Sequence, residues 1–491
     1  MHAAPTPADI EKELTTLRPQ AEKDLQTLVR IDSVYHQDNL DNVKQAATTC
    51  ADLLGAAGME VRIINPPPGS PNGQQPDVPA PIVYATRSCG DPHAPTVLLY
   101  AHYDVVGADW AGAFDPRPVD GRMTGRGAAD DKSGIILHLV TCRYLQNHPD
   151  LRVNLKLVLE GEEEQGTETL PGYMTANPDL FRADVVSLAD AGNVALGKPT
   201  LTTSLRGFVM ADVTVSTLDG EVHNGMYGGP APDAFMALTH MLAKLHDEEG
   251  NVAVPGLKES VWTGHQPDTA EFREAAKVRA GVPLAGTGSL GSRLYSKPSI
   301  NVVGLEEVTQ GSPPPDPRPL PPVRKSRNIL QPAVRARLGV RLPPDEDPKA
   351  AYGHLEAYLL RPDVNTWRAD VKVSYVSGAP GFVASADAGP GFEAARTALR
   401  TAYAGKEVEL AGQGASIPLT NTLQAIEPKA AILLWGCEEP TCNIHGDHES
   451  VSLDELHSMT FAQVLLLVAL ARSKDGAWGA GEQALTGAAT S

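Results

Sequence analysis

The stretch TVLLYAHYD, residues 96–104, joins an apolar run of strand length to a histidine and an aspartate. Three further apolar runs have similar lengths: VNLKLVL (153–159), ADVVSLA (183–189) and AAILLW (430–435). Segments with helical spacing or content accompany these runs, at 8–30, 40–57, 134–146 and 452–472. Because strands that alternate with helices are typical of α/β proteins, we predict an α/β domain with a mostly parallel central sheet.

The middle of the chain shows a different pattern. Residues 209–216 and 334–342 alternate between apolar and polar side chains, which is typical of antiparallel strands with one buried face. Helical segments at 233–248 and 347–360 flank them. This part of the chain therefore predicts an α+β domain rather than a continuation of the parallel sheet.

The expected domain organisation is an interrupted one. The smaller α+β domain spans residues 207–381, and it is inserted into the larger domain formed by residues 1–206 and 382–491. At about 150 residues per domain, a chain of 491 residues has room for this arrangement.

Composition and charge exclude several classes of protein. Hydrophobic residues make up 42% and charged residues 21% of the chain, which allows a sizeable core and excludes general disorder. A net charge of -19 repels phosphate backbones and anionic lipids, so we expect no nucleic-acid partner and no membrane partner. The longest apolar run, residues 461–471, is too short to cross a bilayer.

The expected location is the cytoplasm. The N-terminal segment has neither a basic region nor an apolar stretch of the kind found in secretory signals. The five cysteines are few, scattered and odd in number, which argues against a disulfide framework and fits a reducing compartment.

Candidate metal ligands follow the ends of the predicted strands. His102 and Asp104 follow the first, the glutamates of LEGEEEQG (159–166) the second and Asp190 the third, while His445 comes a short loop after the fourth. Because ligand sites in open α/β sheets form outside the carboxyl ends of the strands, we expect these side chains to converge.

The segment GRGAADDKSG, residues 125–134, adds Asp130 and Asp131 at the start of a predicted helix, where either could simply be a cap. Two histidines and several carboxylates, without paired cysteines, suit catalytic zinc. The set is too large for one tetrahedral ion, but it suits two ions bridged by a carboxylate, with one further carboxylate left as a base.

Together, YAHYD (100–104), GRGAADDKSG, LEGEEEQG, SLAD (187–190) and IHGDHES (444–450) resemble the dizinc metallopeptidase family of carnosinases and cytosolic dipeptidases. Aminoacylase, succinyl-diaminopimelate desuccinylase and glutamate carboxypeptidase are wider relatives. The resemblance extends from about residue 8 to about 470. It implies a three-layer catalytic domain and an inserted lid and dimerisation domain, through which the chain forms a homodimer.

The resemblance also implies the roles of the metal-site residues. Asp104 orients the imidazole of His102, and Glu163 is the general base. A cis peptide bond is expected between Asp130 and Asp131. The implied ligands of the two zinc ions are His102, Asp130 as the bridge, Glu164, Asp190 and His445.

Two positions in these motifs have alternatives. In the glutamate cluster the family pattern fits only with Glu163 as the base, which leaves Glu162 as a solvated surface charge. In IHGDHES the pattern favours His445 as the ligand, and His448 is the alternative.

The inserted domain is expected to contribute further residues by resemblance. His223, in EVHNGMYGGPAPD (221–233), would stabilise the oxyanion at the other protomer's site. Asn328, Arg341 and Ser416 match substrate-binding positions, and Arg341 would hold a free carboxylate. In the loop GQGASIP (412–418), three residues depart from the family pattern and leave substrate recognition open: Gly412, Gln413 and Ala415.

The function implied is hydrolysis of the peptide bond of dipeptides by a water that bridges two zinc ions, with Mn²⁺ or Co²⁺ as alternative metals. An N-acyl-amino-acid deacylase or desuccinylase with the same dizinc site is the alternative. A metal-binding regulator without catalysis is a different class, and the base at Glu163 argues against it. A nucleotide enzyme would rest on GRGAADDKSG alone, which lacks the phosphate-loop pattern.

Overall fold

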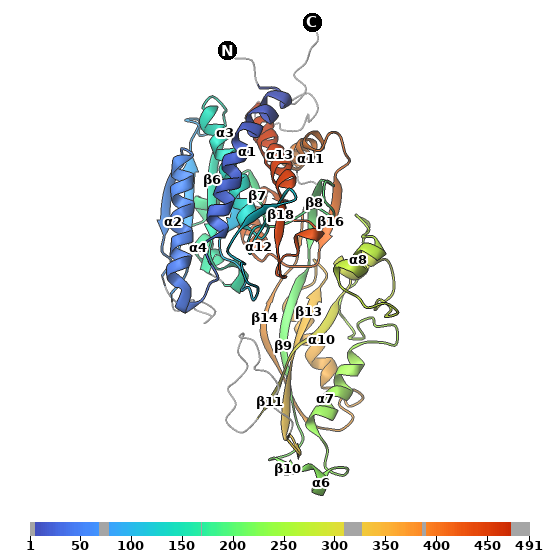
Figure 1. Cartoon of the computed structure of the whole chain (residues 1–491). Coiled ribbons are helices and arrows are strands. Elements are labelled where there is room, and N and C mark those ends of the chain that lie inside the picture. Colours follow the sequence, from blue (N-terminus) through green and yellow to red (C-terminus); the bar gives the residue numbers. More distant parts are fainter. Residues whose placement is uncertain (1–4, 68–77, 168, 309–326, 385–388, 473–491) are drawn as a thin grey trace. The chain divides into compact units, whose positions relative to one another are not determined.

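The computed structural model describes residues 5–67, 78–167, 169–308, 327–384 and 389–472 (Figure 1). The proline-rich segment at 313–322 lies outside these residues. The chain divides into two compact units. Unit 1 comprises Met1–Thr202, Ala384–Ala411 and Thr422–Ser491, and unit 2 comprises Thr203–Val383 and Gly412–Asn421. The domain boundaries expected from the sequence stay predictions.

The centre of unit 1 is a twisted sheet with parallel strands in its middle. Its order is β1 (Glu60–Ile64), β2 (Ile82–Arg87), β6 (Asn154–Glu160), β3 (Thr96–His102), β7 (Val185–Leu188), β17 (Ala431–Leu434) and β8 (Thr200–Leu205). The strands β6, β3, β7 and β17 are parallel, and those at the edges pair antiparallel. The predicted α/β class is therefore confirmed. The sequence analysis did not predict β2 or β8.

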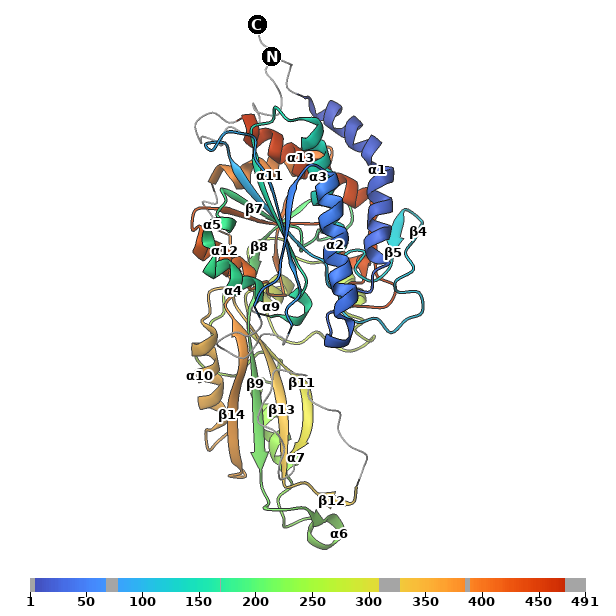
Figure 2. The same ribbon diagram turned by 90° about the vertical axis from the view of Figure 1, so that its left-hand side faces the viewer.

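Helices cover both faces of this sheet. In Figure 2, α2 (Leu40–Ala56) and α3 (Lys132–Asn147) lie on one side of the strands, while α4 (Thr169–Ala176) and α5 (Pro178–Phe181) lie on the other. Two further helices, α1 (Pro7–Val29) and α13 (Leu453–Arg472), pack with α3, and α11 (Gly389–Ala402) packs against β17 and α13. The central strands are therefore buried on both faces, which explains why they are continuous apolar runs.

Short signals fix where these helices begin and end. Thr6 and Asp9 form a capping box at the start of α1, and Gly58, with φ +80°, follows α2. The carbonyl oxygens of Leu28 and Ile31, at the end of α1, accept hydrogen bonds from the buried ammonium of Lys132 at 3.0 and 2.9 Å. The first turn of α3 is therefore tied to the end of α1.

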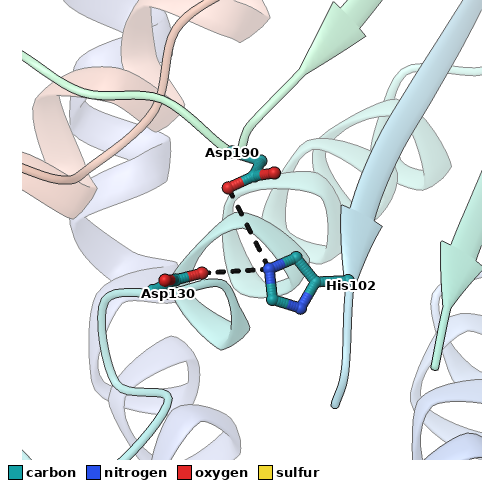
Figure 3. Close-up of side chains that lie close together, drawn as sticks. All are labelled: His102, Asp130 and Asp190. Atoms are coloured by element: carbon teal, nitrogen blue, oxygen red, sulfur yellow. Dashed lines mark hydrogen bonds and ion pairs between the residues drawn. The ribbon is translucent and has the colours of Figure 1, made fainter. Parts of the chain in front are cut away.

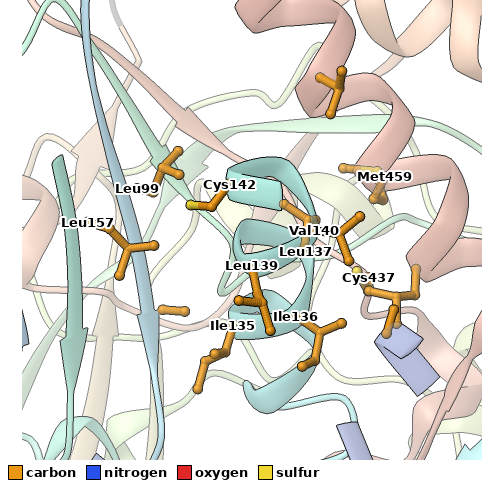
Figure 4. Close-up of a cluster of buried hydrophobic side chains, with 14 of the residues drawn as sticks. Leu99, Ile135, Ile136, Leu137, Leu139, Val140, Cys142, Leu157, Cys437 and Met459 are labelled. Carbon is orange, nitrogen blue, oxygen red and sulfur yellow. The ribbon is translucent and has the colours of Figure 1, made fainter. Parts of the chain in front are cut away.

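The apolar core of unit 1 lies between the sheet and α3. Figure 4 shows Leu99 of β3 and Leu157 of β6 beside Ile135 and Leu139 of α3, and all four belong to one buried cluster. Burying a leucine side chain stabilises a protein by about 1.5–3 kcal/mol, so this cluster is a main source of stability. The cluster also includes Met459 of α13.

Helix α13 is long and apolar enough to cross a membrane by length and composition alone. However, 78% of its apolar window is buried inside the protein, and it packs against α1, α3 and α11. We therefore interpret α13 as a core helix.

A small three-stranded sheet completes unit 1. Its order is β18 (Ser450–Ser452), β5 (Arg122–Thr124) and β4 (Arg117–Val119), all antiparallel. Ser450 pairs with Thr124, which brings the segment after His445 alongside the start of GRGAADDKSG. Two segments more than 300 residues apart in the sequence therefore become neighbours.

Unit 2 contains a four-stranded antiparallel sheet. Its order is β11 (Ser299–Val308), β13 (Ala333–Leu342), β9 (Gly207–Ser216) and β14 (Asp370–Ala379). Helices α7 (Ala234–Leu242) and α10 (Pro348–Leu359) pack against it and share one buried apolar cluster with it. The predicted α+β character of this part is confirmed. Other elements of the unit are β10 (Val222–His223), α6 (Asn224–Tyr227), α8 (Thr269–Ala275), α9 (Leu290–Tyr295), β12 (Ile329–Leu330) and β15 (Phe382–Val383).

We expect Leu99→Ala to lower the free energy of unfolding of unit 1 by about 2–5 kcal/mol, because it leaves a cavity in a fully buried cluster. Calorimetry of the thermal transition would measure the loss. Leu196→Ala, at a residue that is 53% exposed, is the matched control and should change the value by less than about 0.5 kcal/mol. Equal effects of both changes would contradict this description of the core.

Candidate metal centre

His102 ends β3 with its side chain fully buried between carboxylates. Its Nε2 atom lies 2.9 Å from Oδ1 of Asp130 and 4.0 Å from Oδ1 of Asp190, and Figure 3 shows both carboxylates facing this nitrogen. Its Nδ1 atom faces Asp104, 3.1 Å from the carbonyl oxygen and 3.4 Å from Oδ1. Asp104 therefore favours a proton on Nδ1, which leaves the Nε2 lone pair for a metal.

His102, Asp130 and Asp190 form one group of potential metal ligands. Asp130 also belongs to a second group, with Glu164 and His445. Its Oδ2 atom lies 3.1 Å from Nε2 of His445, and the same nitrogen lies 3.1 Å from Oε2 of Glu164. In each group, the potential ligand atoms lie within 4.8 Å of one another. The two oxygens of Asp130 thus face different histidines, which is the arrangement that a bridging carboxylate needs.

The loop that carries Asp130 is held by Glu449, a residue that the sequence analysis did not single out. Its Oε1 atom accepts hydrogen bonds from the backbone N–H groups of Ala129 and Asp130, at 2.9 and 3.1 Å. Its Oε2 atom accepts from Gly127 N–H at 3.0 Å and from Arg126 at 2.6 Å. A signal for it existed in the sequence, because Glu449 lies in IHGDHES (444–450), one of the motifs that carry the family resemblance.

The two aspartates of this loop have different roles. Asp131 caps α3, since its Oδ1 accepts a hydrogen bond from Gly134 N–H at 3.1 Å, so the capping alternative applies to Asp131 and not to Asp130. A Cβ atom at Gly134 would lie 2.2 Å from that oxygen, which explains the glycine. The Asp130–Asp131 peptide bond is cis, and this expectation is confirmed.

Glu163 belongs to neither group of potential ligands. It follows β6 in a short 3₁₀ helix, where the carboxylate of Asp104 accepts hydrogen bonds from the N–H groups of Glu163 and Glu164 at 3.2 and 3.1 Å. Burial raises the pKa of the Glu163 carboxyl to about 7, against the opposing pull of His102. A carboxylate with a pKa near neutrality can both accept and return a proton.

The expectation for Glu162 is wrong. This residue is only 1% exposed, and one of its oxygens accepts hydrogen bonds from the hydroxyls of Thr167 and Thr169, at 2.6 and 2.7 Å. Its other oxygen accepts from Ala80 N–H. A buried carboxylate needs such partners, so Glu162 ties the glutamate loop to its surroundings instead of facing solvent.

Buried carboxylates outnumber cations around these groups. Burial, followed by repulsion from Glu163, raises the pKa of both Asp190 and Glu160 well above the ordinary value. Burial and Asp130 do the same to Glu438, whose Oε1 atom has no hydrogen-bond partner among the described residues. Such an excess of negative charge, together with two imidazoles, fits divalent cations.

Two other histidines and two cysteines lie outside both groups of potential metal ligands. His448 is exposed beside Trp110, outside both groups. His138 is buried, with Nε2 2.9 Å from the carbonyl oxygen of Tyr100, as a packed histidine would be. Cys437 and Cys442 are buried, unpaired thiols outside the two groups.

The residue expected to stabilise the oxyanion, His223, and the three residues expected to bind substrate lie in unit 2. His223 and Asn328 meet side by side, with 3.3 Å between Nε2 and Nδ2, at the pairing of β10 with β12. Arg341, at the end of β13, donates a hydrogen bond to the Ser416 hydroxyl at 3.1 Å. The structure therefore brings these four residues together as two pairs.

The sequence of this chain matches a known protein family over most of its length. Residues 98–468 match the family described as peptidase family M20/M25/M40. A cysteinylglycine-S-conjugate dipeptidase of Corynebacterium striatum is 34% identical over 465 residues, which cover 92% of this chain and 96% of that protein. A Beta-Ala-His dipeptidase of Homo sapiens is 26% identical over 459 residues, covering 88% and 87%.

Solved structures share the fold. Human carnosine dipeptidase 1 superimposes with a TM-score of 0.78 at 23% identity, covering 96% of this chain and all of that one. The dipeptidase Dug1p of Saccharomyces cerevisiae gives 0.77 at 20% identity, covering 96% and 99%. At these identities the likeness shows the fold alone.

We expect the binding of a divalent metal ion to release protons. Hydrogen bonds to Asp130 and Glu164 raise the pKa of His445 to about 10, so the metal-free protein keeps this imidazole protonated at pH 7. A metal binds only the neutral form, so affinity should rise with pH, by about tenfold per unit for each displaced proton. Calorimetric titration in two buffers of different ionisation enthalpy would count the protons.

His445→Ala should lower that count by about one, and His448→Ala, at an exposed histidine of the same loop, should leave it unchanged. An unchanged count in the His445 variant would contradict its place in the metal centre.

Proposed function

We propose that this chain, which belongs to peptidase family M20/M25/M40, is a metal-dependent dipeptidase with two zinc ions per chain. Its membership makes it a hydrolase of peptide bonds, as its motifs predicted. Two relatives that match most of its length are named as dipeptidases, one for cysteinylglycine S-conjugates and one for β-alanyl-histidine. These names support dipeptides as the substrate class.

The observation that carries the proposal is the carboxylate of Asp130, whose two oxygens each face a different histidine. One ion would be held by His102, Asp130 and Asp190, and the other by Asp130, Glu164 and His445. Zinc there would supply a Lewis acid that lowers the pKa of water and polarises the peptide carbonyl. A set so rich in carboxylates also suits Mn²⁺ or Co²⁺.

The chain's own residues would move the protons and orient the reactants. Glu163, held through its N–H by Asp104, accepts a proton from the attacking water and returns it to the leaving amine. Asp104 keeps the proton of His102 on Nδ1. In the same proposal Arg341 binds the substrate carboxylate, Asn328 and Ser416 contact the substrate, and His223 donates a hydrogen bond to the carbonyl oxygen.

Two further parts of the proposal come from the sequence. By resemblance, His223 acts across a homodimer that forms through the inserted domain, and the few, scattered cysteines support an enzyme that works in the cytoplasm.

An N-acyl-amino-acid deacylase is the second candidate, and Gln413 favours it. This neutral amide stands where an acidic residue is common in the family, and its Oε1 atom is buried without a hydrogen-bond partner among the described residues. Without a carboxylate at this position, attraction for a free ammonium group on the substrate is weaker. A panel of dipeptides and N-acyl amino acids, assayed with zinc and with manganese, would separate the two activities.

We expect Glu163→Gln to lower kcat by about 10²–10⁴-fold while two zinc ions per chain remain bound, because the amide cannot accept the proton and the ligands are untouched. Turnover and metal analysis on the same sample would measure both. Asp447→Asn, at an exposed residue near the centre, is the control and should leave both values unchanged. Retained turnover in the Glu163 variant would refute its role as the base.

A further inference from the structure

Arg206, in unit 2, is a buried cation without a carboxylate partner among the described residues. It is 5% exposed, and its guanidinium donates hydrogen bonds to the carbonyl oxygens of Leu294 and Lys297 at 3.0 and 2.8 Å. A third goes to the hydroxyl of Ser299 at 3.1 Å. All three acceptors are neutral, so no carboxylate among the described residues balances the positive charge.

The backbone of Arg206 also contacts the loop GQGASIP. Its N–H donates to the carbonyl oxygen of Gln413 at 3.3 Å, and its carbonyl oxygen accepts a hydrogen bond from the Ser416 hydroxyl. Arg206 therefore connects this loop to the end of α9 and to the segment that follows it.

The last residue of α9 packs directly against the loop. A Cβ atom at Gly412 would lie 2.6 Å from Cγ of Tyr295, so the tyrosine ring occupies the space that a side chain at position 412 would need. This contact explains the departure from the family pattern at Gly412.

Ser416 connects Arg206 to Arg341. Its single hydroxyl proton is used in the bond to the Arg206 carbonyl oxygen, so its oxygen accepts the bond that Arg341 donates at 3.1 Å. The Arg341 guanidinium also lies 5.7 Å from the centre of the Phe208 ring. Its position thus depends on a serine that the backbone carbonyl of Arg206 orients, and the three hydrogen bonds of the Arg206 guanidinium hold that backbone in place.

The other arginines of β13 are paired differently. Arg337 makes two hydrogen bonds to the carboxylate of Asp212, at 2.7 and 2.9 Å, and Arg335 lies 3.2 Å from Glu306. By contrast, burial and then Arg341 lower the pKa of Arg206 to about 10, which still leaves it charged at neutral pH. These two guanidiniums, which have no carboxylate partner in the part of the chain that the structure describes, form a positive region that an anionic group can complete.

We propose that Arg206 is a positioning residue that, through Ser416, holds the Arg341 guanidinium for the free carboxylate of a dipeptide, and so makes the enzyme selective for unblocked C-termini. This inference rests on the proposed function. It adds a selectivity mechanism built from a residue that does not itself touch the substrate.

The test compares Cys-Gly with its C-terminal amide, using the zinc-loaded full chain. We expect the wild-type chain to prefer Cys-Gly by about 10- to 100-fold in kcat/KM, the range expected for hydrogen bonds to a charged group. Arg206→Met and Arg206→Lys should reduce that preference at least about fivefold, mainly through a higher KM for Cys-Gly, with little change for the amide.

Ser416→Ala, which leaves Arg206 in place, should change the preference in the same direction. In an Arg341→Met background, Arg206→Met should cause no further loss, because the two residues act in series. The control is Arg337→Lys, a buried arginine of the same unit with a carboxylate partner, which should leave the preference unchanged.

Equal losses on both substrates, or an unchanged preference in both Arg206 variants and in Ser416→Ala, would overturn the inference and leave Arg206 with a purely structural role. If the wild-type chain hydrolyses no dipeptide at all, the proposed function fails instead. The two failures are therefore distinguishable.

Discussion

The centre of unit 1 depends on one constraint, which is that several carboxylates are buried close together at the carboxyl ends of parallel strands. Like charges at this spacing repel, and burial removes the water that would screen them. The carboxylate of Asp130 lies between His102 and His445. Glu449 holds the loop that carries Asp130, because its carboxylate accepts hydrogen bonds from three backbone N–H groups and from Arg126. The surrounding fold therefore holds these carboxylates close together, although they repel one another.

Much of this was readable from the sequence, because the relevant signals are local. The apolar run before His102 predicted a buried strand, and the structure gives β3 as Thr96–His102. The helical segment at 40–57 predicted α2, and the alternation at 334–342 predicted β13. The convergence of His102, Asp130 and Asp190 followed from a general property of parallel sheets together with family resemblance.

Contacts between distant segments could not be read in this way. Glu162 was expected at the surface because the family pattern leaves it as the variable position. Its carboxylate instead accepts hydrogen bonds from the hydroxyls of Thr167 and Thr169 and from the N–H group of Ala80, which lies 82 residues away in the chain. Glu449 reaches the Asp130 loop only because β18 pairs with β5. Similarly, the neutral surroundings of Arg206 depend on carbonyl groups nearly ninety residues away in the chain. Spacing and residue type give local structure, whereas such partners follow from tertiary packing.

The order of strands in the central sheet has a consequence for biosynthesis. Strand β17 lies between β7 and β8, yet it is separated from them in sequence by nearly all of unit 2. While a ribosome is still making unit 2, β7 has an unpaired edge, and α13, His445 and Glu449 do not yet exist. The nascent chain must therefore carry exposed apolar edges for more than two hundred residues of elongation, which makes it a natural client for chaperones. It also means that the two groups of potential metal ligands are completed only after unit 2 has been synthesised.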